Sequence, residues 1–182
     1  MKEIRLHGRG GMGTVKAAEI IVTAKVLSGG YGNSIPFFGF ERQGAPVTSF
    51  VRLDEKPIRP KTQVYYPDCV IVLDPTIRRA VDVFEGLKDG GWLIINAEPG
   101  TKAADLDLPS TVGTVVMIDA TGLALKRLGK PITNTAMLGA FIKGTAWVGL
   151  EDVMGKVREF WGDKNADLLR EAYDAAQIVS LR

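Results

Sequence analysis

The feature that most limits what this chain can fold into is a glycine-rich turn between a strand and a helix. Apolar and polar residues alternate over Ile4–His7, which predicts a short strand. From Thr14 the apolar residues recur every three or four positions, which predicts a helix to about Leu27, ended by Gly29-Gly30. The residues between the two elements are Gly8, Arg9, Gly10, Gly11, Met12 and Gly13. A tight strand–turn–helix connection of this kind is typical of α/β folds.

The rest of the chain alternates between strand and helix patterns. Apolar or β-rich runs predict further strands at Val47–Leu53, Cys69–Leu73, Trp92–Ile95 and Val115–Ile118. Helices are predicted near Thr76–Leu87 and Thr121–Leu128, and in a wholly helical C-terminal part at Ala136–Val148, Leu150–Trp161 and Lys164–Val179. No strand is expected over Gly29–Pro36. We expect one α/β domain over residues 1–182, with a mostly parallel sheet, helices on both faces in a Rossmann-like three-layer arrangement, and a helical C-terminal segment.

Composition excludes several classes of partner. Apolar residues make up 46% of the chain and charged residues 24%, the balance of a globular protein. The net charge of +2 is too small to predict binding to nucleic acid. The longest apolar run, Cys69–Leu73, is far too short to span a bilayer, and the first residues lack the apolar stretch of a signal peptide. We expect a cytoplasmic protein with no nucleic-acid partner and no membrane span.

The chain has one cysteine and one histidine, which restricts its chemistry. Cys69 alone cannot form an internal disulfide, hold an iron–sulfur cluster or complete a cysteine-rich zinc site, and it is expected to be a buried, inert thiol. His7 has no second histidine with which to share a metal. No catalytic constellation is recognisable. Glu41 and Asp74 are candidate acids, and Asp74 closes a predicted strand at the edge of the sheet where ligands bind.

The glycine turn is a candidate anion site. Free N–H groups at a helix N-terminus and the helix dipole favour phosphate or carboxylate, and Arg9 can add a bidentate contact. A dinucleotide fold needs an acidic residue at the end of a strand about 20 positions further on; here that region is Gly29–Pro36, which contains no acid, and the next one is Glu41. A Walker loop needs Lys after the last glycine, but Gly13 is followed by Thr14. The alternative is that the glycines only allow close packing of strand and helix.

Two further segments are candidate contact sites. Pro36–Pro46 is rich in aromatics, Gly and Pro and is expected to be an ordered loop rather than core. Its candidate interface residues are Phe37, Phe38, Phe40, Glu41 and Arg42; the alternative is that the phenylalanines fill the domain's own core. In Lys130–Ala140, Thr133 or Asn134 can cap a helix, and Asn134 and Thr135 are candidate ligand contacts.

Several long motifs together resemble the gamma subunit of 2-oxoacid:ferredoxin oxidoreductases, closest to the pyruvate/ketoisovalerate type. These motifs are His7–Gly13, Phe38–Val47, Pro67–Asp74, Asp119–Ala124 and Gly129–Ala140. They occur in register over nearly the whole chain. The chain departs from the family pattern at Met12, where Gln is frequent, and at Phe40 and Gln43. The larger Phe40 is compatible with an aryl 2-oxoacid branch.

The resemblance implies a complex that oxidatively decarboxylates a 2-oxoacid to acyl-CoA and CO2. It also implies that thiamine diphosphate, Mg and iron–sulfur clusters lie in the alpha, beta and ferredoxin-like delta subunits. This chain is then an accessory subunit without a catalytic residue, which helps to assemble the complex and to shape the CoA site. Two alternatives stay open: a free-standing Rossmann-like NAD(P)-binding protein, and an interaction domain that binds no ligand.

Overall fold

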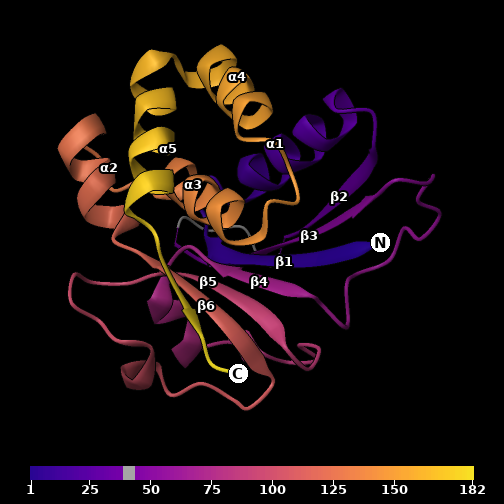
Figure 1. The fold of residues 1–182 in the computed structure, drawn as a ribbon, viewed down its shortest axis with the longest axis horizontal. Coiled ribbons are helices and arrows are strands. Elements are labelled where there is room, and N and C mark those ends of the chain that lie inside the picture. Colours follow the sequence, from indigo (N-terminus) through magenta and orange to yellow (C-terminus); the bar gives the residue numbers. More distant parts are fainter. Residues whose placement is uncertain (39–43) are drawn as a thin grey trace.

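The centre of the molecule is a sheet in the order β2-β3-β1-β4-β5-β6-β7, seen in a computed structural model that describes residues 1–38 and 44–182 (Figure 1). The strands are β1 (Lys2–Arg9), β2 (Tyr31–Phe38), β3 (Pro46–Asp54), β4 (Cys69–Val72), β5 (Gly91–Asn96), β6 (Val112–Ile118) and β7 (Gln177–Ser180). The pairs β1–β4, β4–β5 and β5–β6 are parallel. The pairs β1–β3, β2–β3 and β6–β7 are antiparallel. Five of these strands therefore point one way and β3 and β7 point the other, which confirms a mostly parallel sheet.

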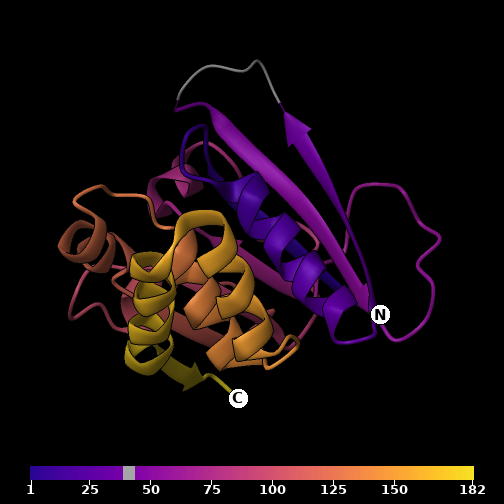
Figure 2. The same cartoon turned by 90° about the horizontal axis from the view of Figure 1, so that it is seen from above.

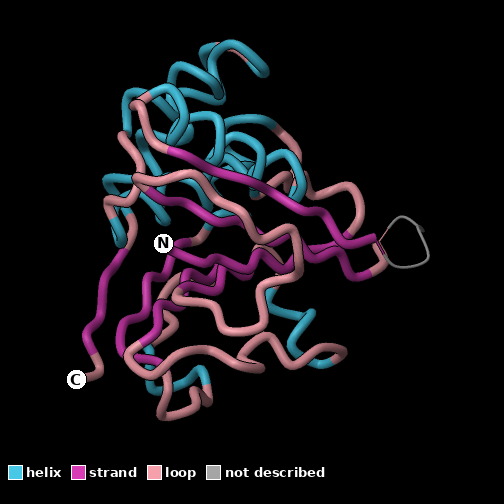
Figure 3. The backbone as a smooth tube through the Cα atoms, turned by 90° about the vertical axis from the view of Figure 1, so that its right-hand side faces the viewer, coloured by secondary structure: helices cyan, strands magenta, loops and turns pink. Residues whose placement is uncertain are grey.

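The α-helices of the described residues all cover one face of the sheet (Figures 1 and 3). They are α1 (Thr14–Leu27), α2 (Ala120–Leu128), α3 (Asn134–Thr145), α4 (Leu150–Trp161) and α5 (Asp163–Ala175). Their apolar sides pack on alternate strand residues such as Leu6, Ile71 and Val116, with Phe141 of α3 fully buried between them. The predicted bounds of α1 and α4 are confirmed. None of these helices is long and apolar enough to cross a membrane.

The opposite face has no α-helix within the described chain. Val70, Leu93 and Val115 form a second core there, covered by the short 3-10 helices η1 (Pro75–Arg79) and η2 (Ala103–Leu106) and by loops. The helix predicted over Thr76–Leu87 is therefore wrong. The carbonyls of Val83 and Glu85, which a helix would bond internally, accept hydrogen bonds from the buried Arg5 guanidinium instead. The three layers are present, but the third is made of 3-10 turns and loops.

Two strands were missed by the sequence patterns. Gly29–Pro36 was expected to contain no strand, yet β2 occupies most of it and pairs with β3 as a hairpin (Figure 2). β2 lies at the edge of the sheet, where Pro36 is tolerated because its missing N–H is not needed by a second neighbour. The predicted helix Lys164–Val179 ends at Ala175, and β7 follows as the other edge strand, so the C-terminal part is not wholly helical.

Candidate functional site

The glycine turn lies where the parallel strands β1, β4, β5 and β6 end. Gly11 and Gly13 have φ angles of +92° and +78°, a backbone region that favours glycine. At position 8 glycine is required because a side chain has no room: a Cβ there would lie 2.1 Å from Thr14 Oγ1. On the other side of the turn, Gly10 exchanges hydrogen bonds with the start of the β3 region: its N–H donates to Ala45 O at 2.9 Å and its carbonyl accepts from Gly44 N at 3.2 Å.

The turn presents backbone amides at the start of α1. Gly13 is the N-cap residue and provides no side-chain cap, and the first turn of α1 has no acidic residue. Among the residues that the structure describes, no acceptor is bonded to the amides of Gly11 or Gly13. The buried hydroxyl of Thr14 also has no partner there. Free amides at the positive end of a helix dipole form a site for phosphate or carboxylate.

The N-terminus of α3 meets the same turn. A Cβ at Gly13 would lie 2.3 Å from Asn134 Nδ2, so the Asn134 amide packs directly on the glycine backbone. Asn134 Oδ1 accepts from the N–H of Thr135 at 2.8 Å. The side chain of Thr135 is fully buried and lies 3.3 Å from Asn165 Oδ1. The structure therefore brings Gly13 and Asn134 together, and the buried Thr135 holds the Asn134 side chain through its backbone N–H.

An open pocket of ≈ 500 Å³ adjoins this contact. It is lined by Gly11, Gly13, Lys16, Leu128, Lys130, Ile132, Asn134, Trp161 and Asn165. Two lysines, an indole ring and an aliphatic wall thus surround the free amides, a combination suited to an anion that also carries an apolar or planar part. The sequence patterns did not identify Lys16, Lys130 or Trp161 as site residues. The three lie on α1, in the loop before α3 and at the end of α4, which come together only in the folded chain.

Arg9 is held by neighbours rather than directed into the pocket. Its Nε donates to Asp74 Oδ2 at 2.7 Å, and its other two nitrogens donate to Gly44 O at 3.1 Å and Thr76 Oγ1 at 2.9 Å. Burial raises the pKa of Asp74, but hydrogen bonds from Thr76 and from Arg9 outweigh this, so its pKa lies below the usual range. The guanidinium therefore fixes the turn to the segment after β4.

Asn96 is a second residue that sequence reasoning missed. It closes β5, and its Nδ2 donates to Leu73 O at 3.1 Å and to Thr121 Oγ1 at 2.8 Å. Its Oδ1 accepts from the N–H of Ala120 at 3.0 Å, at the start of α2. The available signal was a polar residue placed directly after the apolar run of a buried strand.

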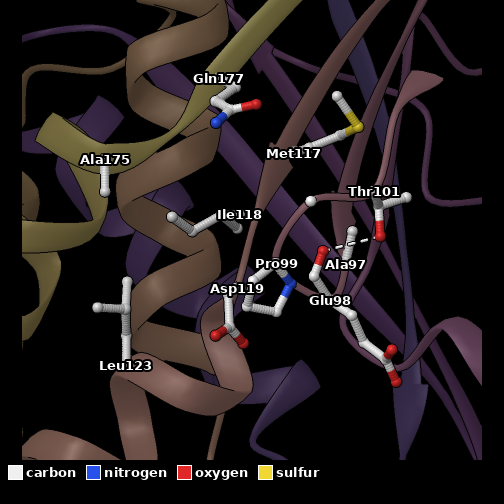
Figure 4. Close-up of a pocket in the computed structure, with 11 residues that line it drawn as sticks. Ala97, Glu98, Pro99, Thr101, Met117, Ile118, Asp119, Leu123, Ala175 and Gln177 are labelled. Atoms are coloured by element: carbon white, nitrogen blue, oxygen red, sulfur yellow. Dashed lines mark hydrogen bonds between the residues drawn. The ribbon is translucent and has the colours of Figure 1, made fainter.

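A smaller cavity of ≈ 270 Å³ lies further along the same edge, after β5 and β6 (Figure 4). The loop Ala97–Thr101 forms one wall, and Leu123 of α2, Ala175 and Gln177 form the other. Asp119 faces this space, but its Oδ1 accepts from Gly122 N at 2.7 Å as the N-cap of α2. The Asp119 carboxylate is thus engaged in capping α2.

The single histidine and the single cysteine of the chain, His7 and Cys69, are both buried. Burial, and then the charge of Arg5, lowers the pKa of His7 to about 3, and the Arg5 Nε donates to His7 Nε2 at 3.1 Å. Burial, and then the charge of Asp68, raises the pKa of the Cys69 thiol well above its usual value. His7 is thus held neutral and Cys69 protonated, which suits neither for acid–base or nucleophilic work at neutral pH.

The candidate interface residues lie at and beyond the end of β2. Phe37 is 51% exposed, and β2 ends at Phe38. Phe40, Glu41 and Arg42 lie outside the described residues. For Phe37, the alternative that the side chain fills the domain's own core is therefore wrong.

Comparison with known proteins gives matches over almost the whole chain. The profile of the family described as "Pyruvate ferredoxin/flavodoxin oxidoreductase" matches residues 3–178. A protein of Thermococcus kodakarensis named "Pyruvate/ketoisovalerate oxidoreductases common subunit gamma" is 49% identical over 185 residues, covering 100% of both chains. The gamma subunit of the NADH-dependent phenylglyoxylate dehydrogenase of Aromatoleum evansii is 48% identical over 153 residues, or 84% of this chain and 80% of that one.

The fold is also found in a crystal structure. The pyruvate oxidoreductase subunit PORC of Thermotoga maritima superposes with a TM-score of 0.85 at 30% identity, covering 98% of each chain. The predicted α/β fold therefore occurs in a solved protein over its full length.

Proposed function

Because the chain belongs to the pyruvate ferredoxin/flavodoxin oxidoreductase family, we propose that it serves as the gamma-type accessory subunit of a 2-oxoacid oxidoreductase. The observation that carries this is the match to a gamma subunit over the full length of both chains. The buried state of His7 and Cys69 supports an accessory role, because neither side chain is placed to act on a substrate.

The assembly would cleave the bond between the carboxyl and carbonyl carbons of a 2-oxoacid. The carboxylate leaves as CO2 and the carbonyl carbon forms a thioester with CoA, whose thiol proton is released. Two electrons pass to ferredoxin or another acceptor. We assign thiamine diphosphate, Mg and the iron–sulfur clusters to alpha, beta and ferredoxin-like delta subunits, in a cytoplasmic complex. A single buried cysteine supports this assignment, since a cluster needs several accessible thiolates.

The pocket beside the glycine turn would hold part of the CoA molecule. The free amides of Gly11 and Gly13 and the ammonium groups of Lys16 and Lys130 suit phosphate oxygens, and the Trp161 ring suits a planar base. Met12 has no side-chain amide to offer there, so contact by its side chain would be by packing. The chain's own contribution is to bind and orient CoA while the reacting carbon lies in other subunits.

The free-standing NAD(P)-binding alternative has no specific support. The strand that follows α1 is β2, which is separated from β1 by the antiparallel β3. Its last two residues are Phe37 and Phe38, where a ribose-binding fold would need an acidic side chain.

The first test is native mass and cofactor analysis of the tagged chain purified gently from its own host. We expect larger subunits to co-purify, with iron, sulfide and thiamine diphosphate in stoichiometric amounts. A lone, colourless chain under conditions that preserve complexes would contradict the subunit assignment. A complex whose KM for CoA is unchanged by Lys130→Ala and by Lys16→Ala would leave a purely structural role.

A further inference from the structure

The connection between β3 and β4, residues 55–68, is long and has no helix or strand. It begins where β3 ends, whereas the glycine turn lies beside the start of β3. The two regions are thus separated by the nine residues of β3, roughly 30 Å of extended chain. Figure 2 shows the connection projecting beyond the sheet near the N-terminus, away from the grey trace.

This connection exposes two aromatic rings. Tyr65 is 63% exposed and Tyr66 is 68% exposed, more than any other large apolar or aromatic side chain that the structure describes. Tyrosine is enriched at protein interfaces because it adds contact area at low cost in side-chain entropy. Exposed on a rigid loop, such a pair is a candidate anchor for a partner.

The same connection carries three cations without partners. Lys56, Arg59 and Lys61 are exposed, and no acidic residue occurs from position 56 to 67. No carboxylate of the described residues forms an ion pair with any of the three. By contrast, the acids that flank the connection are paired: Glu55 with Lys25, and Asp68 with Lys88 at 2.9 Å.

Hydrogen bonds from the side chains of Arg52 and Asn33 hold the backbone of this connection in place. The buried Arg52 guanidinium forms an ion pair with Glu3 at 2.9 Å and donates to Thr62 O at 2.6 Å and Gln63 O at 2.9 Å. Asn33 Nδ2 donates to Pro60 O at 3.0 Å. A surface fixed in this way loses little conformational entropy when a partner binds.

We propose that residues 55–68 dock an acidic segment of another subunit of the same assembly, an inference that rests on the proposed function. The cations provide charge complementarity and steer the encounter, and the two tyrosines provide the contact area. An acidic polypeptide fits better than a nucleic acid, because the net charge of the whole chain is only +2.

The test uses the intact complex carrying a tagged chain. Carbodiimide, which joins lysine to carboxylate, is expected to link Lys56 or Lys61 to an Asp or Glu of another subunit, identified by peptide mass spectrometry. The triple variant Lys56→Glu, Arg59→Glu and Lys61→Glu is expected to lower the salt concentration that releases the chain and to weaken its association by more than about tenfold. Lys164→Glu, an exposed lysine on α5, serves as the control and is expected to have no effect.

A second variant separates the role of the rings from that of the charges. Tyr65→Ala with Tyr66→Ala should weaken association without changing its salt dependence, and the thermal unfolding of the chain should stay the same. Cross-links only within the chain, or reversal variants that assemble like wild type, would overturn the docking proposal and leave the subunit assignment intact. Release that depends on nuclease treatment would instead assign the surface to nucleic acid. Failure of the wild-type chain to associate with any subunit would overturn both.

Discussion

At the scale of single residues, one face of β1 carries polar side chains in an interior position. Arg5 and His7 alternate with the core residues Ile4 and Leu6, and both are almost completely buried. Arg5 Nε donates to His7 Nε2 at 3.1 Å, so the ring proton lies on Nδ1, which has no partner among the described residues. The neutral imidazole is the form that this arrangement requires, because a protonated ring could not accept from a guanidinium.

This arrangement predicts a pH dependence of stability below neutrality. Burial, and then the charge of Arg5, lowers the pKa of His7 from 6.5 to about 3 in the folded chain. Between these values the unfolded chain binds a proton that the folded chain does not, so folding stability falls as pH falls from about 6.5. We expect a loss of about 2 kcal/mol between pH 7 and pH 5, measured by urea unfolding at each pH.

The variant His7→Gln isolates this effect, because His7 is the only histidine of the chain. Glutamine can still accept from Arg5 but does not titrate. We expect its stability to change little between pH 7 and pH 5, whatever its absolute value. Equal slopes for the variant and the wild type would show that His7 is not the group responsible.

At the scale of elements, side-chain hydrogen bonds, and not the backbone hydrogen bonds between strands, connect the segments at the edge where β1, β4 and β5 end. Arg9 joins the glycine turn to Asp74 and Thr76 after β4. Thr133 Oγ1, before α3, donates to Leu73 O at 3.3 Å, a carbonyl that also accepts from Asn96. The candidate pocket thus depends on bonds that cross from one strand–helix unit to the next.

Asn96→Ala is expected to loosen this edge. It removes the donors to Leu73 O and Thr121 Oγ1 and the acceptor of Ala120 N. Leu73 O keeps its bond from Thr133, but the buried N–H of Ala120 loses its partner. We expect the free energy of unfolding to fall by about 2–3 kcal/mol in urea titrations. Asn33→Ala, which removes one exposed bond to Pro60 O, is the matched control and should cost less than about 1 kcal/mol. Equal losses for the two variants would contradict a central role for Asn96.

At the scale of the whole molecule, the chain presents two surfaces at opposite ends of β3. The glycine turn, its pocket and Phe37 lie at one end, and the proposed docking surface lies at the other. A subunit arranged in this way can bind a ligand at one end while it contacts neighbouring subunits at both.

Phe37→Ala tests the first surface. Phe37 is 51% exposed, so its truncation should change the free energy of unfolding by less than about 1 kcal/mol. Association with the larger subunits should weaken by more than about tenfold if the ring is buried in the complex. Leu27→Ala, 58% exposed at the end of α1, is the control and should change neither quantity. Urea unfolding measures the first quantity, and native mass spectrometry at graded protein concentrations measures the second. Identical dissociation for the two variants would remove Phe37 from the interface.

Elements with a local signal could be predicted from the order of residues alone. The period of α1, the glycine turn before it and the apolar runs of β4, β5 and β6 each depend on neighbouring residues, and all were predictable. The same holds for the buried Cys69, which is the first residue of one such run. The several motifs that resemble a known family also lie within short segments, and the family was therefore recognisable.

Features that depend on pairing between distant segments could not be predicted and follow from the folded arrangement. Gly32–Pro36 has no strand pattern of its own and becomes part of β2 because β3 offers backbone partners. Residues 76–87 do not form the predicted helix because Arg5, far away in the sequence, bonds the carbonyls of Val83 and Glu85. Arg9 was predicted to contact an anion, but its donors meet Asp74, Gly44 and Thr76 once the strands are aligned. Such contacts arise only when the chain is folded, because their free energy depends on the geometry between elements and not on the order of residues along one of them.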